Sequence, residues 1–557
     1  MRTIKFLIKY IYNTILNFVY YLIIKTSLKG KKTLPSKLPF IAYEIFTNLN
    51  KHKLFDNKII LPYNEIDNFN KININRPNEV LEIKVIKPKK TFKVNLIKTR
   101  DVILPLALLD KRQLNKNKND KIKLSYNGKN ILVELKYKNR FHYLPISCSE
   151  SFDEIEIKAN NYPISIAKPI YRDQLEQNNK PKLIVHIFID ALPQSIIEKF
   201  GYDIMPNTQK YFLNGGTFYS NAFAQSEWTL SSIAGVFTGK YTRDHMIYHP
   251  RKNQKIANET LADKLTDEGY LTFACSNVPK LTPLNGFDKG FNRFIMSIDQ
   301  DCNYIIDQAC EQLDSFGGNQ YMFLSFFDIH ESHKLQPVSS QVSNKIEDFQ
   351  YKEILGNSKD TRVLFDNERI NMCKRSITHF DKKIKRLYDK IDEYTTDSIV
   401  IIHSDHGVNF MTKTSELLGK EREKVLFMYK NGVETSVNNN IKEIREIPNM
   451  IINDLGINNY FKYHNENIAI SESLYPNKDY EISLRTNKHV LFFKVNWRFV
   501  KNKDYEKYKY SYSFHLLNEE EKKLEINESN KNDFNLMLKN AKNHYKKMCI
   551  NLTLKNR

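Results

Sequence analysis

Hydrophobic residues between positions 183 and 403 gather in short continuous runs, and amphipathic stretches separate these runs. Strands of a parallel sheet have this appearance because helices bury both of their faces. In the stretches between the runs, apolar residues follow the helical period. The alternation predicts an α/β domain with a central, mostly parallel sheet between helices. The predicted strands are Leu183–Ile189, Leu271–Cys275, Tyr321–Phe327 and Ser398–His403, and the predicted helices are Asn207–Leu213, 229–238, Leu261–Glu268 and Ile377–Ile391.

The regions on either side of this domain show different patterns. Apolar and polar residues alternate in Val80–Val85 and Phe92–Ile97, and Asn127-Gly128 separates two further strand-like runs, as in a hairpin. After residue 435 the pattern becomes mixed, with antiparallel strands expected before a basic helix. We therefore expect a hydrophobic and basic membrane-proximal segment at 1–32, an accessory β-rich domain at 33–172, a catalytic α/β domain at 181–435, and a small antiparallel-sheet subdomain with a basic tail helix at 436–557.

The first 32 residues combine an apolar run with basic residues. Ile11–Ile24 is apolar and aromatic, but it is short and contains Asn13 and Asn17, whereas a spanning helix needs about 20 apolar residues. No small-residue cleavage site follows, so a cleaved signal peptide is not expected. Four lysines between residues 25 and 32 favour a cytoplasmic location for the bulk of the protein. An interfacial anchor, a spanning anchor and an ordinary packed helix all remain open, and we expect association with a membrane surface.

The chain is strongly basic. Its 85 Lys and Arg residues exceed its 64 Asp and Glu residues, which gives a net charge of +21 and favours anionic partners such as lipids or glycans. A genome-wide bias towards Lys, Asn and Ile would give the same composition. The basic residues are dispersed and no nucleic-acid motif is present, so no nucleic-acid partner is expected. The six cysteines form no CxxC pair, which argues against a disulfide framework and a thiolate zinc site.

Acidic and imidazole side chains stand at the ends of the predicted strands. Asp190 ends the first strand, where a carboxylate is costly to bury unless it is paired or bound to a cation, although a helix cap near residue 194 is the alternative. Asp405 and His406 follow the last strand, and Gly407 lets the chain turn so that both side chains can face one metal ion. Because sites in parallel sheets form at the carboxyl ends of strands, these side chains are expected to meet.

Two further segments have catalytic residue types. Asp328, His330, Glu331 and His333 lie within six residues after the third strand, which suits metal ligation or protonation of a leaving group. Thr229 begins a predicted helix, and helix N-termini attract phosphate or sulfate. A metal ion beside its hydroxyl would make it a nucleophile, whereas a plain N-cap is the alternative reading.

These residues belong to a longer pattern that resembles the sulfatase family of the alkaline phosphatase superfamily. The span 205–241, MPNTQKYFLNGGTFYSNAFAQSEWTLSSIAGVFTGKY, keeps the order of motifs around the nucleophile in that family. Leu261–Thr272, Gly286–Phe294, Phe327–His333 and the SDHG motif at 404–407 follow in register. The resemblance covers residues 181–530 and implies an alkaline-phosphatase-like α/β sandwich.

The resemblance also implies roles for individual residues. The residues expected to hold a divalent metal ion (zinc, manganese or calcium) are Asp190, Thr229, Asp405, His406 and Asp328. Those expected to act in catalysis are Thr229 as the nucleophile, His333 and His330 at the substrate or leaving group, and Lys420 as the substrate-binding lysine.

The chain departs from the family pattern at the nucleophile. Sulfatases carry Cys or Ser there, matured to formylglycine and followed by x-Pro-x-Arg, whereas this chain has Thr229, Ser231 and Ile233. Threonine cannot yield formylglycine, and Asp190 is followed by Ala191 instead of a second acid. A threonine there with a single leading Asp resembles the phosphotransferase and phosphodiesterase branch of the superfamily. This resemblance implies a metal-dependent phosphoester hydrolase or phosphotransferase, which we expect to act on a surface-glycan or lipid-linked substrate. A sulfuric ester hydrolase of the same fold and a non-catalytic glycan- or membrane-binding scaffold are the alternatives.

Overall fold

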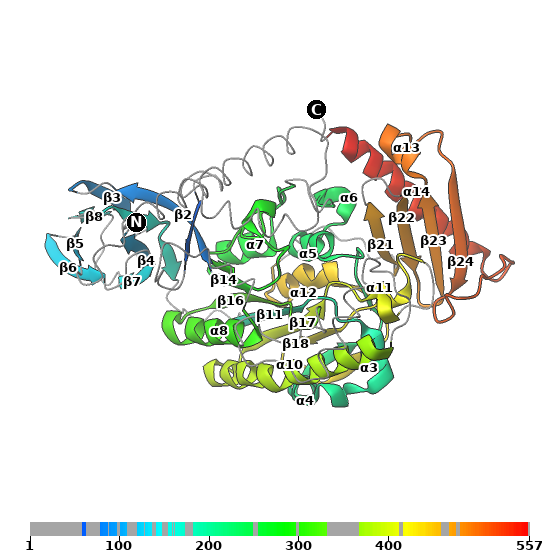
Figure 1. Cartoon of the computed structure of the whole chain (residues 1–557), viewed down its shortest axis with the longest axis horizontal. Helices are drawn as coiled ribbons and strands as arrows, with labels where there is room; N and C mark the ends of the chain where they lie inside the picture. Colours follow the sequence, from blue (N-terminus) through cyan, green and yellow to red (C-terminus); the bar gives the residue numbers. More distant parts are fainter. Residues whose placement is uncertain are drawn as a thin grey trace, which may run out of the picture. The chain divides into compact units, whose positions relative to one another are not determined.

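The structure, a computed structural model, divides the chain into two compact units (Figure 1). The first comprises Met1–Ile170 with His249–Asn253, and the second comprises Tyr171–Tyr248 with Gln254–Arg557. The predicted anchor at 1–32 lies outside the described residues. The residues that the structure describes are 58–62, 78–86, 89–96, 101–108, 120–126, 128–135, 141–146, 154–158, 160, 162–172, 182–248, 254–296, 300–330, 367–411, 416–457, 467–474 and 479–554.

The first unit is built from antiparallel strands, so the prediction of a β-rich fold for the N-terminal part is confirmed. The predicted hairpin is present, with Tyr126 opposite Lys129 and Gly128 at a φ of 70°, where a residue without a side chain carries no steric cost. One group of strands contains β1 (Lys58–Pro62), β2 (Asn78–Ile86), β4 (Asp101–Leu108), β7 (His142–Ile146), β9 (Ile164–Ala167) and β10 (Ile170–Arg172), and the other contains β3 (Thr91–Asn95), β5 (Asp120–Tyr126), β6 (Lys129–Leu135) and β8 (Glu154–Lys158).

The second unit is organised around a mostly parallel sheet, as predicted. Its strand order is β15-β14-β16-β11-β17-β18-β12-β19; the first five strands run parallel to one another, and β18 is antiparallel to both of its neighbours. All seven residues of the central strand β11 are buried, which explains its unbroken apolar run. The strands are β11 (Leu183–Ile189), β12 (Gly216–Tyr219), β14 (Leu271–Ser276), β15 (Arg293–Met296), β16 (Gln320–Phe326), β17 (Ser398–Ser404), β18 (Phe427–Lys430) and β19 (Ser436–Asn438).

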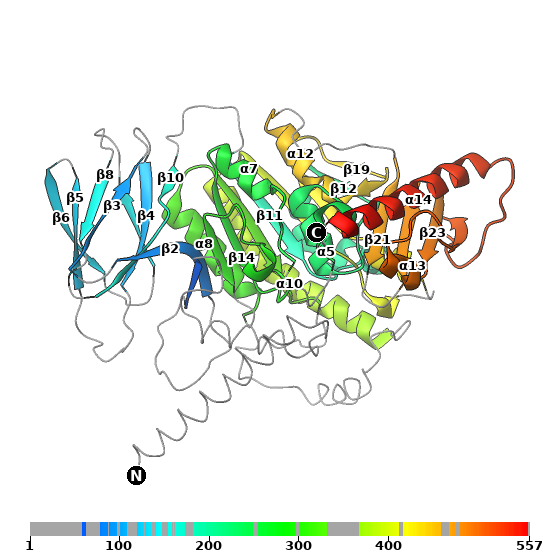
Figure 2. The same ribbon diagram turned by 90° about the horizontal axis from the view of Figure 1, so that it is seen from above.

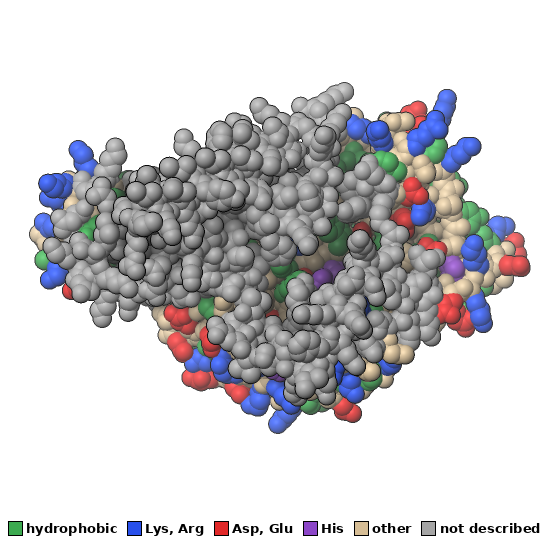
Figure 3. All heavy atoms as spheres, in the orientation of Figure 1, with side chains coloured by type: hydrophobic (Ala, Val, Ile, Leu, Met, Phe, Trp, Pro, Cys, Tyr) green, Lys and Arg blue, Asp and Glu red, His purple; other side chains and the backbone are tan. Residues whose placement is uncertain are grey.

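Helices cover both faces of this sheet (Figure 1). On one face lie α4 (Pro206–Phe212), α8 (Cys302–Phe316) and α10 (Asn367–Tyr394), and on the other lie α5 (Thr229–Thr238), α7 (Leu261–Asp267) and α12 (Ile447–Asp454). Basic and acidic side chains are interleaved along the outer edge formed by α8 and α10 (Figure 3), where ion pairs such as Arg386–Asp307 join the two helices. The positive charge of the chain is therefore partly balanced on this edge.

A smaller antiparallel sheet, β21-β22-β23-β24, completes the second unit, and the long helix α14 (Lys531–Leu554) packs against it (Figure 2). The predicted small antiparallel sheet in the C-terminal part is thus confirmed. Among the described residues, no helix has both the length and the apolar content that crossing a bilayer requires. The strands are β21 (Ala469–Leu474), β22 (Tyr480–Arg485), β23 (His489–Val495) and β24 (Tyr510–Leu516).

Candidate active site

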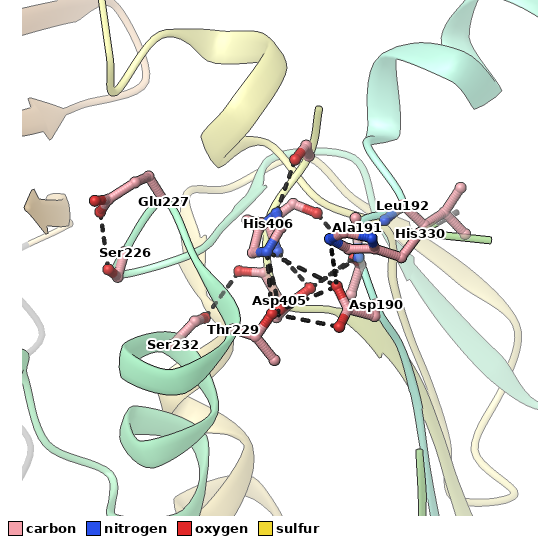
Figure 4. Close-up of polar contacts among 12 residues, drawn as sticks. Asp190, Ala191, Leu192, Ser226, Glu227, Thr229, Ser232, His330, Asp405 and His406 are labelled. Carbon is pink, nitrogen blue, oxygen red and sulfur yellow. Dashed lines mark hydrogen bonds and ion pairs between the residues drawn. The ribbon is translucent and has the colours of Figure 1, made fainter. Parts of the chain in front are cut away.

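Thr229 is the first residue of α5, and its side chain faces two predicted metal ligands (Figure 4). Its Oγ1 lies 3.3 Å from Asp190 Oδ2 and 3.3 Å from His406 Nε2. The N-cap position belongs to Trp228, and no side chain caps the helix there. The hydroxyl of Thr229 is therefore directed at acidic and imidazole groups, and the plain N-cap reading does not hold.

Asp190 follows the last residue of β11 and is only 1% exposed. It does not cap the next helix, α3 (Gln194–Phe200), whose N-cap is Pro193. The next residue, Ala191, has a φ of 60°, a left-handed conformation that costs a non-glycine residue roughly 1–2 kcal/mol. This conformation lets the N–H of Ala191 donate to Asp405 Oδ1 at 3.0 Å. The strained backbone of Ala191 thus helps to orient the carboxylate of Asp405.

Asp405 and His406 follow β17, the neighbour of β11, so adjacent strand ends supply the acids, as the sequence predicted. Asp405 Oδ1 accepts from the backbone N–H groups of Ala191 and His406, whereas its buried Oδ2 has no hydrogen-bond partner. His406 Nδ1 lies 2.8 Å from the carbonyl oxygen of Gly407 and must donate to it, because a carbonyl only accepts. His406 Nε2 therefore presents a lone pair, 3.3 Å from Asp405 Oδ2.

These groups fit a cation. The lone pair on His406 Nε2 faces Asp405 Oδ2 at 3.3 Å, and two acceptors that face each other form an arrangement that a positive ion would satisfy. Ligand atoms of Asp190, His330 and His406 lie within 4.8 Å of one another. Nitrogen and carboxylate oxygen are the donors that zinc accepts. The described residues could therefore hold a divalent metal ion here.

Burial controls the charge state of the same groups. Burial, followed by the negative charge of Asp405, raises the pKa of Asp190 well above its usual range. Burial raises the pKa of Asp405 to about 7, and burial together with the positive charge of Arg422 lowers the pKa of His406 to about 3. The histidine is thus neutral, as ligation requires, and two carboxylates are held where their charges need a counter-ion.

The structure brings together only part of the predicted site. His330 Nε2 lies 3.8 Å from Asp190 Oδ1, and its ring stacks on Phe327, so it joins the cluster. Asp328 does not join it, because its two oxygens accept from the N–H of Cys302 and the side-chain amide of Asn277.

Lys420 also lies outside the cluster. Its Nζ lies 3.5 Å from Glu198 Oε2, and its backbone N–H donates to Glu520. His333 lies outside the described residues. Glu227, two positions before Thr229, turns away from the cluster (Figure 4) and accepts from Ser226 and Ser473.

Two cationic residues near the site were not predicted. Arg422, in α11 (Lys420–Glu423), acts electrostatically on His406 and Asp405, and Lys280, after β14, acts on Asp190. The sequence suggested a basic residue after the SDHG segment but directed attention to Lys420. The pattern Lys-Glu-Arg-Glu at 420–423 does not indicate which of its two cations acts on the site, because α11 is a single turn.

Comparisons with known proteins bear on the second unit. Residues 182–441 match the family model described as Sulfatase. Three solved structures illustrate the similarity, each at 12% sequence identity or less. The search of curated proteins returned no match. The structures are BT4656 with its substrate D-glucosamine-2-N,6-O-disulfate (11% identity, TM-score 0.47, 66% of this chain and 98% of that one), BT1596, a 2-O GAG sulfatase (12%, 0.47, 66% and 93%), and a phosphonate monoester hydrolase of Agrobacterium radiobacter (12%, 0.46, 67% and 96%).

The matched range begins one residue before β11 and ends after β19, so it contains Asp190, Thr229, His330, Asp405 and His406. It therefore contains every residue of the cluster described above. The prediction of an ester-cleaving enzyme is confirmed at the level of the family. The resemblance that the motifs indicated is confirmed as well, over the residues 182–441 that match the Sulfatase family model.

Proposed function

We propose that this protein is a metal-dependent phosphoester hydrolase or phosphotransferase in which Thr229 is the nucleophile. The observation that carries the proposal is the position of Thr229 Oγ1, 3.3 Å from both Asp190 Oδ2 and His406 Nε2 at the first turn of α5. The first backbone N–H groups of a helix have no partner within the helix and suit an anion. A nucleophilic hydroxyl and an anion-binding helix end thus coincide.

Asp190, Asp405 and His406, with His330, are the residues that would hold the metal ion. When bound, a divalent cation supplies Lewis-acid chemistry: it neutralises charge on the ester and lowers the pKa of a nearby hydroxyl. The contribution of the protein is to hold these donors in place. The carbonyl oxygen of Gly407 accepts from His406 Nδ1 and fixes the ring. The N–H of Ala191 donates to Asp405 Oδ1 and fixes the carboxylate.

In the proposed reaction, Thr229 Oγ1 forms a bond to phosphorus, and the bond from phosphorus to the leaving oxygen breaks with its electron pair on that oxygen. Asp190 and His406 lie within reach of the threonine proton. His330, which is 38% exposed on its side chain, is placed to give a proton to the leaving oxygen. Water, or an acceptor hydroxyl in a transferase, then attacks the phosphothreonine and regenerates Thr229.

Sulfate-ester hydrolysis is the second candidate, because residues 182–441 match the Sulfatase family model. Phosphate is preferred here because the residue at the nucleophile position is threonine, which cannot become the formylglycine of sulfatases. A surface-glycan or lipid-linked substrate, and membrane association through residues 1–32, remain predictions from the basic composition of the chain.

The test compares release of nitrophenol from its phosphate monoester, phosphodiester and sulfate ester by metal-loaded protein. We expect release from a phosphate ester, and a loss on the order of 10⁴-fold or more for Thr229→Ala. Thr238→Ala is the matched control, because Thr238 lies in the same helix and its hydroxyl bonds only to the Ala234 carbonyl. Mass spectrometry of quenched reactions should detect phosphate on Thr229.

A result of sulfate release alone would establish the sulfatase alternative. Equal activity of wild type and Thr229→Ala would contradict the proposed nucleophile. Absence of bound metal together with absence of Thr229-dependent activity would favour the non-catalytic scaffold.

A further inference from the structure

The side chain of Asn277 joins the ends of two parallel strands beside the candidate active site. Asn277 follows the last residue of β14, is only 3% exposed, and donates its backbone N–H to the carbonyl of Ser325 in β16. Its side-chain Oδ1 accepts from the N–H of Phe327 at 2.7 Å. Its Nδ2 donates to Asp328 Oδ2 and to the carbonyl oxygen of Gln300, each at 3.0 Å. The oxygen and the nitrogen of the amide are thus both hydrogen-bonded, and a side-chain amide is the group that offers an acceptor together with two N–H donors.

The turn that Asn277 holds is the one that carries His330. The N–H of His330 donates to the carbonyl oxygen of Phe327 at 3.2 Å, and the two rings stack with their centres 4.6 Å apart. Asp328, between them in sequence, also accepts from the N–H of Cys302, the first residue of α8. Phe327 and Asp328 are therefore both fixed from outside the turn, and His330 is fixed on Phe327.

The conformation of this turn decides which side chain it presents to the candidate active site. His330 Nε2 lies 3.8 Å from Asp190 Oδ1 (Figure 4), although the side chain of His330 is 38% exposed. A partly exposed side chain on a short turn keeps its rotamer freedom unless its neighbours restrict it. The ring of Phe327 supplies that restriction. The hydrogen bond from Asn277 to Asp328 keeps the neighbouring carboxylate away, so the turn presents an imidazole and not an acid.

We infer that Asn277 is the positioning residue of His330, and that it acts by holding the turn at Phe327 and Asp328. This inference rests on the proposed function, since His330 is the proton donor in that reaction. Asn277 itself contacts no reacting atom. A displacement of a catalytic group by about 1 Å can cost on the order of 10²-fold in rate. Loss of Asn277 should therefore impair the action of His330, and it should have no further effect once His330 is replaced.

The test is a double-mutant cycle of Asn277→Ala and His330→Gln in the metal-loaded full chain. The readout is kcat/KM for two esters of the class that wild type hydrolyses, one with phenol and one with nitrophenol as the leaving group. Phenolate is more basic than nitrophenolate and depends more on a proton donor. Asn277→Ala should lower kcat/KM by roughly 10- to 100-fold for the phenyl ester and by less than about threefold for the nitrophenyl ester. In the His330→Gln protein it should change neither value.

Asn292→Ala is the matched control. Asn292 Oδ1 accepts from the N–H of Thr272 at 2.9 Å, at the start of β14 and therefore at the opposite end of that strand from Asn277. The control should leave the ratio of the two kcat/KM values unchanged. Phe327→Leu is a second variant that keeps the backbone N–H and removes the stacked ring, so it should shift the ratio in the same direction even if Asn277→Ala folds poorly. The thermal midpoint is measured for every variant.

Losses that simply multiply in the double variant would overturn the inference, because Asn277 would then act independently of His330. Coupled losses of equal size for the two esters would keep the positioning role and reject proton donation by His330. If the protein hydrolyses neither ester, the proposed function fails, and the same cycle is measured in the affinity for zinc by competition with a chelating dye, since His330 belongs to the cluster that could hold the ion. Coupling there, about 10-fold, would support the inference without catalysis, and independent effects would overturn it.

Discussion

The second unit buries charged side chains in two regions, and the partners of these side chains differ between the two. At the ends of β11 and β17, Asp190 and Asp405 are 1% and 0% exposed, and they lie against the imidazole rings of His330 and His406. Near β22, Arg485 is also 0% exposed, but it donates to Glu520 at 3.3 Å and to Ser483 at 2.6 Å. In the first region the acids lie against histidines, and Lys280 and Arg422 act on them electrostatically. In the second region the arginine is joined directly to a carboxylate.

The difference separates a site from a structural element. A buried ion pair with its hydrogen bonds satisfied needs no further partner, although removal of one member is costly. Buried acids without a counter-ion are expensive, and such perturbed groups collect at functional sites. The negative charge of Asp190 and Asp405 is thus what a bound cation would balance. The four predictions below test this contrast.

The largest effect is expected for Asp405→Asn. The substitution removes a ligand charge, so we expect loss of bound metal and a fall in activity on the order of 10³-fold or more. The metal-free variant should nevertheless be at least as stable as metal-free wild type, because its amide can donate to His406 Nε2, 3.3 Å from the present Oδ2. Elemental analysis, kinetics and urea denaturation measure these three quantities.

Asp389→Asn is the matched control for that variant, since Asp389 is exposed and pairs only with Lys385 on the same helix. It should change none of the three quantities measurably. If Asp405→Asn lowered the stability of the metal-free protein by several kcal/mol, the carboxylate of Asp405 would stabilise the fold without a metal ion, as the pair of Arg485 and Glu520 does.

The second effect is expected for Arg485→Met, which acts on the balanced region. Removing the guanidinium leaves Glu520, 8% exposed, without the cation of its ion pair, so the free energy of unfolding should fall by about 3–5 kcal/mol. The activity of the folded fraction and its metal content should stay close to wild type. Arg386→Met, at an exposed pair with Asp307, should cost less than about 1 kcal/mol. A similar cost for both variants, measured by urea denaturation, would remove the distinction between buried and exposed pairs.

The third effect concerns pH. Burial raises the pKa of Asp405 to about 7, so between pH 4 and pH 7 the folded metal-free protein binds a proton that the unfolded chain has released. Its contribution to stability is present at low pH and is lost as the pH rises through 7, by about 1.4 kcal/mol per pH unit at most. A bound cation should replace the proton and reduce this dependence.

The measurement for this effect is the free energy of unfolding against pH, with chelator and with metal. Asp405→Asn provides the reference, because the difference between its curve and that of wild type isolates the carboxyl group from other titrating groups. If the wild-type curve in chelator runs parallel to that of Asp405→Asn, the pKa of Asp405 does not differ between the folded and the unfolded protein. The perturbed carboxyl group proposed here would then be wrong.

The sequence was sufficient to predict the sheet and the helix that begins at Thr229, because each of these elements is a contiguous run of residues. Leu183–Ile189 is both the predicted run and the observed β11, and α5 spans 229–238 as expected. The helix predicted at 377–391 begins ten residues earlier, at Asn367, because the apolar stripe continues through Ile370 and Cys373 among polar residues. Local pattern thus places elements well and their ends less well.

The ligand set was harder to predict, because it depends on which way a side chain turns after a strand. Asp328 and His330 both follow β16, yet Asp328 binds Cys302 and Asn277, and His330 faces Asp190. No residue type or spacing distinguishes these outcomes. The backbone carbonyls of residues 422–424 accept hydrogen bonds from three loops that are distant in sequence, and a linear pattern does not contain such contacts.

The smallest effect is expected for Lys420→Gln, at the residue that the family pattern suggested as a substrate ligand. Its Nζ lies 3.5 Å from Glu198 Oε2, and both side chains are partly exposed, at 28% and 36%. Such a pair contributes about 0–1 kcal/mol, so stability should change by less than that and kcat/KM by less than about threefold. Steady-state kinetics of Lys420→Gln and wild type on the nitrophenyl ester that wild type hydrolyses measures this difference directly. A tenfold or greater loss of kcat/KM in Lys420→Gln would mean that Lys420 leaves Glu198 for the substrate and that it belongs to the candidate active site.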